Sequence, residues 1–302
     1  TMPDSPVNMP EISLLPSLSW KDYELLDSGN GAKLERFGAY TFIRPEHQAV
    51  WQPALPTVKW DAAHAVFQAE SGEETGGRWV VRKSIADTWT MRYRGLRFAA
   101  HFTNSRHLGV FPEQAAHWDW MADQVRSAGR SVRVLNLFGY TGLATLAAAQ
   151  AGAAVTHVDA SKKAVSWARE NQALSNLTEK PIRWIVDDAL KFVQREARRG
   201  VKYDGIILDP PKFGRGPKGE VWEVYKSLPD LLEACRACLS EKPLFVVTTI
   251  YAVRASAVHV AQAMDDMMAG FGGKIEMGEL VTREQSAGRL LSQAVYARWE
   301  NT

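Results

Sequence analysis

Short apolar runs alternate with longer helical patterns through residues 113–302, and this alternation decides the fold class. Helical patterns are expected at about 113–128, 141–151, 161–175, 188–198, 221–239 and 253–269. The apolar runs are VLNLF (134–138), VTHVD (155–159), IRWIV (182–186), GIILD (205–209) and PLFVVTT (243–249). Such alternation is typical of βα units, which form a buried parallel sheet covered by helices.

Two further strand-like runs follow, KIEMGELVT (274–282) and SQAVYARWE (292–300), and the short loop between them predicts an antiparallel pair. The seven runs together predict an α/β fold with a seven-strand, Rossmann-like sheet that is mainly parallel and whose last strand is antiparallel. Ser161 and Asp188 each stand where a helix is expected to begin, and both are predicted N-caps.

The first part of the chain has a different pattern, which predicts a small β-rich region. Its β-branched and aromatic runs are AYTFIRP (39–45), RWVVRKS (78–84) and TWTMRYRGLRF (88–98), and the turn SGEETGG (71–77) separates the first two. We therefore divide the chain into a β-rich region, 1–112, and an α/β region, 113–302.

Composition excludes several classes of protein. The 36 basic residues nearly balance the 34 acidic ones, so the net charge of +2 does not by itself indicate a polyanionic partner. Cys235 and Cys238 are the only cysteines and the seven histidines are scattered, so neither a disulfide framework nor a metal site is expected. The first twenty residues do not resemble a leader, and no run of eighteen apolar residues occurs. These features predict a soluble, cytoplasmic protein without a membrane segment.

Acidic residues and glycines follow the predicted strands, at the edge of the sheet where ligands bind in open α/β folds. Gly139 and Gly142 follow the first strand in NLFGYTG, and Asp159 follows the second. Asp187 and Asp188 follow the third strand, and a further aspartate follows the fourth. A strand-to-helix turn without ligand would also use the two glycines, but a series of acids at strand ends is not a core pattern.

Two kinds of nucleotide-like ligand are compatible with this glycine turn. A dinucleotide needs the GxGxxG frame to hold its pyrophosphate, but here Phe138 occupies the first glycine position and Ala144 the third. S-adenosylmethionine (SAM) has no phosphate and does not need that frame. The glycine turn therefore favours SAM over a dinucleotide.

The segment Asp209-Pro210-Pro211-Lys212-Phe213 predicts a rigid loop with hydrogen-bond acceptors that point into a pocket. Two successive prolines fix the backbone and donate no hydrogen bonds, so their carbonyls are available to a ligand between a carboxylate and an aromatic ring. With this loop the chain resembles the class I SAM-dependent methyltransferases over roughly residues 101–302. FTNSRHLGVFPEQ, NLFGYTG, DDAL and DPPKFGRG are similar to the bacterial large-subunit ribosomal-RNA methyltransferases, which modify 23S RNA.

The resemblance implies a role for each motif. The glycine turn would line the methionine part of SAM, Asp159 would hold the ribose, Asp188 would accept from the adenine amino group, and FPEQ (111–114) would close over the cofactor. The implied cofactor-binding residues are Phe111, Pro112, Gln114, Asn136, Phe138, Gly139, Tyr140, Thr141, Gly142, Asp159, Ala160, Ser161, Asp187, Asp188, Ala189 and Asp209. Two alternatives remain open. Asp159 could be a plain helix cap, and Asp187 could be a solvated neighbour of Asp188 that does not contact the cofactor.

The acceptor loop indicates the type of transfer. Asp209 and the Pro210 carbonyl can accept hydrogen bonds from an exocyclic amino group while Phe213 stacks on a flipped base; Pro211 and Lys212 complete the implied catalytic set, although Lys212 is equally well a surface charge. Methylation of pyrimidine carbon 5 needs a cysteine that adds to the ring. DPPKFGRG and VVTTIYAV contain none, and Cys235 and Cys238 are expected in the core. A nitrogen or oxygen acceptor, with S-adenosylhomocysteine as the second product, is therefore expected.

A basic stretch at 78–106 suggests where RNA binds. It has seven basic residues against one acid, a local net of +6, with aromatic residues interleaved, and such surfaces suit single-stranded RNA. Arg92, Tyr93 and Arg94 are the predicted substrate contacts. An amphipathic strand, with buried aromatic residues and solvated arginines, explains the same pattern.

Three functions remain open: methylation of RNA, first of all ribosomal RNA; methylation of a protein side chain or small molecule; and a SAM-binding module that holds RNA with little catalysis. The salt dependence of RNA binding separates the second from the others. Turnover separates the first from the third, and the oligomeric state is left open.

Overall fold

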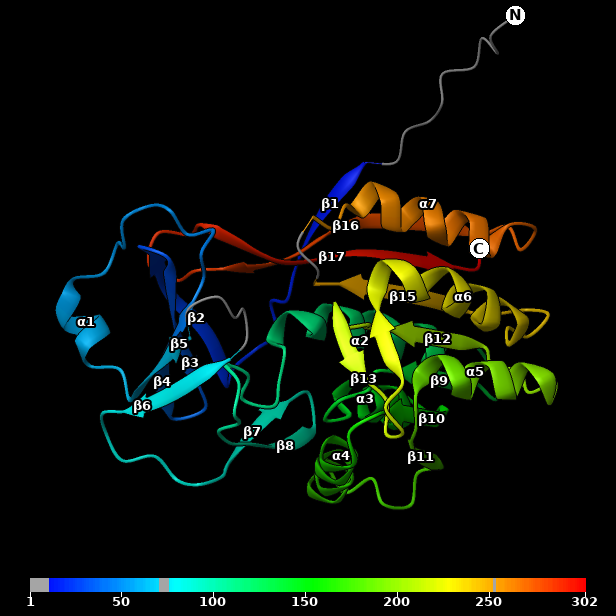
Figure 1. Ribbon diagram of the computed structural model, residues 1–302, viewed down its shortest axis with the longest axis horizontal. Coiled ribbons are helices and arrows are strands. Elements are labelled where there is room, and N and C mark those ends of the chain that lie inside the picture. The colour runs from blue at the N-terminus through cyan, green and yellow to red at the C-terminus, as the bar shows by residue number, and fades with distance from the viewer. Residues whose placement is uncertain (1–10, 71–75, 252–253) are drawn as a thin grey trace, which may run out of the picture.

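The structure, a computed structural model, describes residues 11–70, 76–251 and 254–302. Its main element is an eight-stranded sheet in the order β1-β16-β17-β15-β12-β9-β10-β11 (Figure 1). The strands are β1 (Ile12–Pro16), β9 (Arg133–Leu137), β10 (Ala154–Asp159), β11 (Ile182–Val186), β12 (Gly205–Leu208), β15 (Phe245–Ile250), β16 (Lys274–Arg283) and β17 (Leu290–Glu300). β17 runs antiparallel to β15 and β16, and the other pairings are parallel. The predicted α/β class and mainly parallel sheet with an antiparallel last strand are confirmed.

The sequence predicts seven strands in this sheet, and the structure adds an eighth. β1 pairs in parallel with β16, although it lies in the part of the chain assigned to the β-rich region. It is an edge strand in which Ile12 and Leu14 are exposed. Its five residues, ISLLP, end in a proline and do not alternate between apolar and polar types, so the sequence carries no period-two signal that would place this run in the sheet.

Helices cover both faces of this sheet, because successive strand residues point to opposite sides. Val134 of β9 belongs to the core cluster that contains α2 and α3, and Leu135 to the cluster that contains α5, α6 and α7. The helices are η1 (Pro112–Gln114), α2 (Ala115–Ser127), α3 (Leu143–Ala151), α4 (Lys162–Leu174), α5 (Ala189–Arg198), α6 (Val224–Ala237) and α7 (Ala257–Met268).

Most predicted helix bounds hold to within a few residues, and two differ for identifiable reasons. Both N-caps are confirmed, since Ser161 Oγ accepts from Ala164 N at 3.2 Å and Asp188 Oδ1 from Lys191 N at 2.9 Å. The helix expected from 221 begins at 224, because β14 (Val221–Glu223) pairs with β13 (Phe213–Arg215) instead. The helix expected from 253 begins at 257, and residue 253 lies outside the described residues.

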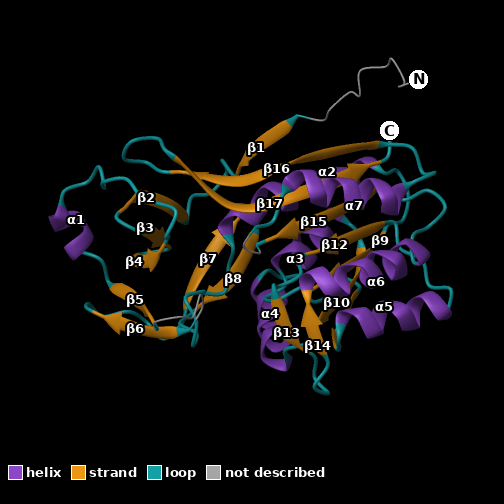
Figure 2. Cartoon of the chain, turned by 45° about the horizontal axis from the view of Figure 1, so that its top comes forward, coloured by secondary structure: helices purple, strands orange, loops and turns teal. Residues whose placement is uncertain are grey.

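The β-rich part contains a five-stranded sheet and a separate hairpin (Figure 2). The sheet is β2 (Tyr23–Gly29), β3 (Ala32–Phe37), β4 (Tyr40–Pro45), β5 (Ala65–Ala69) and β6 (Gly77–Val81), with helix α1 (Thr57–Asp61) between β4 and β5. The hairpin is β7 (Trp89–Tyr93) with β8 (Leu96–Ala100). Each of the three predicted runs contains β-structure, but the run 88–98 forms two strands, β7 and β8, joined by a turn at Arg94 and Gly95. Residues 71–75 of the predicted turn lie outside the described residues.

One apolar core runs from the β-rich sheet to the large sheet. A single cluster contains Phe42 of β4, Met91 of β7, Trp118 of α2 and Val134 of β9. Aromatic contacts strengthen it, with the Trp20 ring 4.6 Å from Tyr93 and 6.1 Å from Trp118. The hairpin β7–β8 therefore packs between the two sheets.

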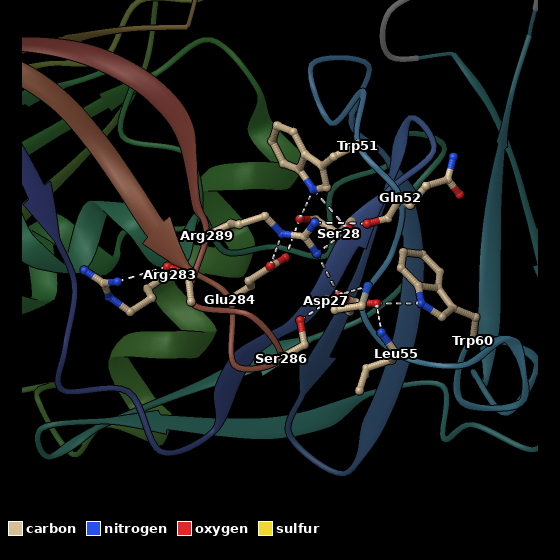
Figure 3. A network of polar contacts seen from close by, with 12 residues as sticks. Asp27, Ser28, Trp51, Gln52, Leu55, Trp60, Arg283, Glu284, Ser286 and Arg289 are labelled. Atoms are coloured by element: carbon tan, nitrogen blue, oxygen red, sulfur yellow. Dashed lines mark hydrogen bonds and ion pairs between the residues drawn. The ribbon is translucent and has the colours of Figure 1, made fainter.

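A polar network makes a second connection between the two parts (Figure 3). The β16–β17 hairpin extends to the β-rich sheet, where its tip residue Ser286 donates to Asp27 at 2.6 Å (Figure 1). Asp27 is fully buried and also accepts from Leu55 N at 2.9 Å and Trp60 Nε1 at 3.0 Å. Arg289 pairs with Glu284 and reaches Asp27. Because buried charges need several partners, this network fixes the hairpin tip on the β-rich sheet.

Candidate functional site

The glycine turn after β9 has a backbone that few residues tolerate. Phe138 and Tyr140 have positive φ angles of 58° and 51°, and Gly142 has 84°, where side chains other than glycine cost energy. Gly139 is required for a different reason, since a Cβ there would lie 2.3 Å from Cε1 of the His157 ring. The predicted turn is confirmed, with Gly142 needed for its angle and Gly139 for space.

Asp159 at the end of β10 ties this turn to the next helix. Its Oδ2 accepts from Tyr140 N at 2.9 Å, and its Oδ1 accepts from Ser161 N at 2.8 Å. Burial raises the pKa of Asp159, although the hydrogen bonds from Ser161 and Tyr140 oppose that rise. Asp159 is therefore not a plain helix cap, because Ser161 caps α4.

A buried polar chain supports the turn from below. Asn136 Nδ2 donates to Thr145 Oγ1 at 2.9 Å, and that oxygen lies 2.9 Å from His157 Nδ1. Asn136 was expected to line the cofactor, but this is wrong for its side chain, which is buried and bonded within the core. Thr141 is also buried, and its hydroxyl donates to Gly109 O at 2.7 Å.

The two acids after β11 have different environments. Asp187 Oδ2 pairs with Arg195 at 2.6 Å, and its Oδ1 accepts from Asp188 N. Asp188 caps α5 through Oδ1, and no described residue donates to its other oxygen. Ala189, the first residue of α5, is buried. Of the two acids, Asp188 therefore has an oxygen without a donor among the described residues.

The acceptor loop is built on a short hairpin. Trp222 Nε1 of β14 donates to Pro211 O at 2.7 Å, so the protein already uses one acceptor position of a carbonyl that the sequence predicted to be available to a ligand. The Phe213 ring is 60% exposed, large for an aromatic side chain, and the Lys212 ammonium lies 5.8 Å from its centroid. The loop thus presents an open aromatic face on a fixed backbone.

The segment before α2 reaches the acceptor loop and the end of β15. Gln114 Nε2 lies 3.4 Å from Asp209 Oδ2 and donates to the Tyr251 hydroxyl at 3.0 Å, and that hydroxyl donates to Glu113 Oε1 at 2.9 Å. The Phe111 ring lies 5.4 Å from that of Tyr251. Sequence reasoning missed Tyr251, although it directly follows β15 as Asp209 follows β12.

This site favours a neutral carboxyl group. Burial and the nearby Glu113 carboxylate raise the pKa of Asp209 to about 8. Burial also raises the pKa of Glu113, although Lys33 opposes it, and burial together with Glu113 and Asp209 raises that of Tyr251. Two carboxyl groups in an enclosed place disfavour a second charge, so Asp209 holds a proton at neutral pH.

The predicted substrate residues at the end of β7 and in the turn after it do not all face solvent. Arg92 and Arg94 are exposed, but Tyr93 is only 3% exposed and its hydroxyl donates to Asp119 at 2.7 Å. The expectation that Tyr93 contacts substrate is wrong, because the amphipathic-strand alternative describes this segment. Arg94 contacts Ser19 and Asp119. Neither of these residues belongs to the candidate site at the strand ends of the large sheet.

Neither cysteine lies at the site. Cys235 and Cys238 are buried at the end of α6, as expected, and burial raises the pKa of both thiols. Within residues 11–70, 76–251 and 254–302, no group of three or more His, Cys, Asp or Glu side chains could hold a metal ion. Among the described helices, none is long and apolar enough to cross a membrane.

Comparison with known proteins identifies the family. A family model described as S-adenosylmethionine-dependent methyltransferase matches residues 42–265. A solved structure, the SAM-dependent methyltransferase from Agrobacterium tumefaciens, is 49% identical with a TM-score of 0.92, covering 96% of this chain and 94% of that one.

Curated relatives match a shorter part of the chain. Ribosomal RNA large subunit methyltransferase K/L from Shewanella sp. (strain ANA-3) is 42% identical over 42% of this chain and 17% of its own length. Ribosomal RNA large subunit methyltransferase I from Shewanella frigidimarina is 36% identical over 39% of this chain and 29% of its own. The chain thus spans less than a third of these two relatives.

Proposed function

The chain belongs to the S-adenosylmethionine-dependent methyltransferases, and from this premise we propose that it methylates RNA, first of all ribosomal RNA, at a nitrogen or oxygen atom. The observation that carries the proposal is the acceptor loop, which combines the exposed Phe213 ring with the half-buried Asp209 carboxyl group, whose pKa is raised to about 8. An open aromatic face suits a base that has left its stack. The two Shewanella relatives are named for ribosomal RNA, which supports the same class of substrate.

The strand-end residues suit SAM. Asp159 is rigidly bonded to the glycine turn, and a fixed carboxylate is suited to ribose hydroxyls. Asp188 Oδ2 is suited to the adenine amino group, and the Phe111 ring, 5.7 Å from that of Tyr140, is suited to cover the methionine part. The proposed cofactor set keeps the residues predicted from the sequence, except that Asn136 and Thr141 support the turn with their side chains.

When bound, SAM supplies a sulfonium-activated methyl group for in-line displacement. The protein's residues mainly align the acceptor and exclude water. An exocyclic amino group would donate to a carboxyl oxygen of Asp209 and to the Pro210 carbonyl, which directs its lone pair toward the methyl carbon. Phe213 would hold the base ring, and Gln114 would hold Asp209.

The β-rich region has a place in this proposal. We assign substrate placement to residues 1–112, with Arg92 and Arg94 as exposed cations for the RNA backbone, and methyl transfer to residues 113–302. A cytoplasmic location fits an RNA substrate and two free buried thiols.

The acceptor loop is tested by Asp209→Ala and Phe213→Ala. Methyl transfer from labelled SAM to RNA should fall at least tenfold in both variants, while the dissociation constant of SAM measured by calorimetry stays within about threefold. Full transfer by both variants with unchanged SAM binding would contradict the assigned acceptor loop.

A further inference from the structure

A second cavity lies beside the acceptor site. It has a volume of about 610 Å³ and is formed by the end of β4, the segment before η1, the end of β15 and the β16–β17 hairpin. Its lining includes Glu113 and Tyr251, whose hydrogen bond also forms part of the network around Asp209. The cavity therefore adjoins the proposed acceptor site and shares one wall with it.

One wall of this cavity has hydrogen-bond donors that the protein does not fully use. Gln293 Nε2 is buried, and no described residue accepts from it. Among the described residues, the contacts of Lys33 Nζ are long, 3.3 Å to Gln293 Oε1 and 3.6 Å to Glu35 Oε1. Since a buried donor without an acceptor costs free energy, these two side chains suit a ligand with acceptor oxygens.

Charged and polar neighbours of Lys33 hold this wall in place. Arg44 binds Glu35 through two hydrogen bonds of 2.7 Å, and Tyr23 donates to the same carboxylate at 2.8 Å. The network around Asp27 fixes the hairpin that carries Gln293 on the sheet that carries Lys33 (Figure 3). The donors are therefore preorganised.

The cavity also offers aromatic surface. His107 and Phe111 line it, with ring centroids 4.8 Å apart and tilted by 41°. Burial, together with Arg44 and Arg106, lowers the pKa of His107 to about 3, so its ring is neutral. Neutral rings and hydrogen-bond donors that line the same cavity suit a planar heterocycle that carries carbonyl groups.

We propose that this cavity binds the base of the nucleotide next to the methylated one in the RNA strand. A base carbonyl accepts from Gln293 and Lys33, and the base ring packs against His107 and Phe111. This inference rests on the proposed RNA methylation and extends it, because it assigns part of the sequence specificity to residues of the β-rich region and of the β16–β17 hairpin. The wall formed by Tyr251 and Glu113 separates this base from the acceptor.

The test uses the full chain, labelled SAM and total RNA from a strain that lacks the protein. Gln293→Leu and Lys33→Met should each raise the KM for RNA about tenfold, as expected for a lost hydrogen bond in an enclosed site. For Gln293→Leu, which removes no charge, kcat at saturating RNA and SAM affinity should stay nearly unchanged. The matched controls are Gln285→Leu and Lys59→Met, whose side chains are exposed on the hairpin tip and on α1; both should keep the wild-type KM.

The outcomes separate this inference from the proposed function. Label in RNA with the same KM for pocket and control variants would overturn the inference alone. No label in RNA from the wild-type protein would overturn the proposed function and this extension of it together.

Photo-crosslinking of the wild-type protein provides a readout that does not depend on how the variants fold. RNA containing 4-thiouridine should crosslink to peptides from residues 44–48 or 292–295. Crosslinks at the acceptor loop with none in these two segments would overturn the inference.

Discussion

The Tyr251 hydroxyl donates to Glu113 at 2.9 Å and accepts from the adjacent Gln114 at 3.0 Å, so one side chain after β15 fixes two consecutive residues before α2. Gln114 in turn lies within 3.4 Å of Asp209. The acceptor loop is thus connected to the segment before α2 through the Gln114 amide, which the Tyr251 hydroxyl also holds.

Replacing this phenol should loosen the acceptor site. Tyr251→Phe leaves the buried Glu113 without its donor, so we expect a loss of about 1–3 kcal/mol in the free energy of unfolding. kcat should fall about tenfold, since Gln114 is no longer held. Denaturation and single-turnover methyl transfer measure the two effects. Tyr225→Phe, at a 58% exposed position on α6, is the control; equal values for both variants would refute the role of Tyr251.

The pH dependence of the reaction should follow Asp209. Its pKa of about 8 means that the carboxylate, the stronger acceptor, forms only as the pH rises through that value. We expect kcat/KM of the wild-type protein to rise between about pH 7 and 9. The amide that replaces the carboxyl group in the Asp209→Asn variant does not ionise in this range. The variant should therefore have a low kcat/KM that does not rise between about pH 7 and 9. A wild-type profile that is flat across this range would contradict the assignment.

The raised pKa of Asp209 also predicts how the stability of the fold depends on pH. A carboxyl group whose pKa is raised in the folded state stabilises the fold below its unfolded pKa, and this contribution is lost as the pH rises toward about 8. Asp209→Asn should therefore have a higher Tm than the wild-type protein at pH 9, and the difference should shrink as the pH falls toward 4. Calorimetry across this range checks the sign; a lower Tm of the variant at pH 9 would be the wrong result.

Asp27 should contribute to the stability of the fold with a pH dependence opposite to that of Asp209. Burial alone would raise its pKa, but hydrogen bonds from Ser286, Leu55 N, Trp60 and Ala54 N outweigh it and lower the pKa. Its stabilisation is present above the unfolded pKa and is lost as the pH falls through the folded one. Asp27→Asn should cost about 2–4 kcal/mol at pH 7, and the difference should narrow in acid. Asp61→Asn, on the exposed surface of α1, should cost nothing measurable.

Gly139 should tolerate no side chain. A Cβ at 2.3 Å from the His157 ring forces the glycine turn or the buried ring to move, so Gly139→Ala should lower the free energy of unfolding by about 1–3 kcal/mol and weaken SAM binding. Gly214→Ala is the control, because its Cβ would lie 3.5 Å from Pro211, an ordinary contact. Thermal denaturation and SAM titration measure both variants, and wild-type values for Gly139→Ala would rule out the steric account.

Local signals in the sequence predict much of the fold and part of the candidate site. The strands of βα units and the caps at Ser161 and Asp188 depend on residues close together in the chain, so their patterns are visible directly. The same holds for the exposed Phe213 after two prolines. These features need no knowledge of distant contacts.

Long-range contacts explain what the sequence did not reveal. β1 joins the sheet through β16, more than 250 residues away, and Ser286 meets Asp27 across a similar separation of 259 residues. Tyr93 and Asn136 carry suitable chemistry, but their neighbours Asp119 and Thr145 use it within the fold. A residue type indicates what a side chain can bind, and only packing decides whether it faces a ligand.

The central claim is methyl transfer to RNA. It is tested most directly by adding the protein and isotope-labelled SAM to an extract from cells that lack this protein. RNA, protein and small molecules are then separated and counted. The account predicts label in ribosomal RNA, at a nitrogen or oxygen atom after nucleoside digestion, and its loss with Phe213→Ala. Label confined to protein or small molecules would contradict it.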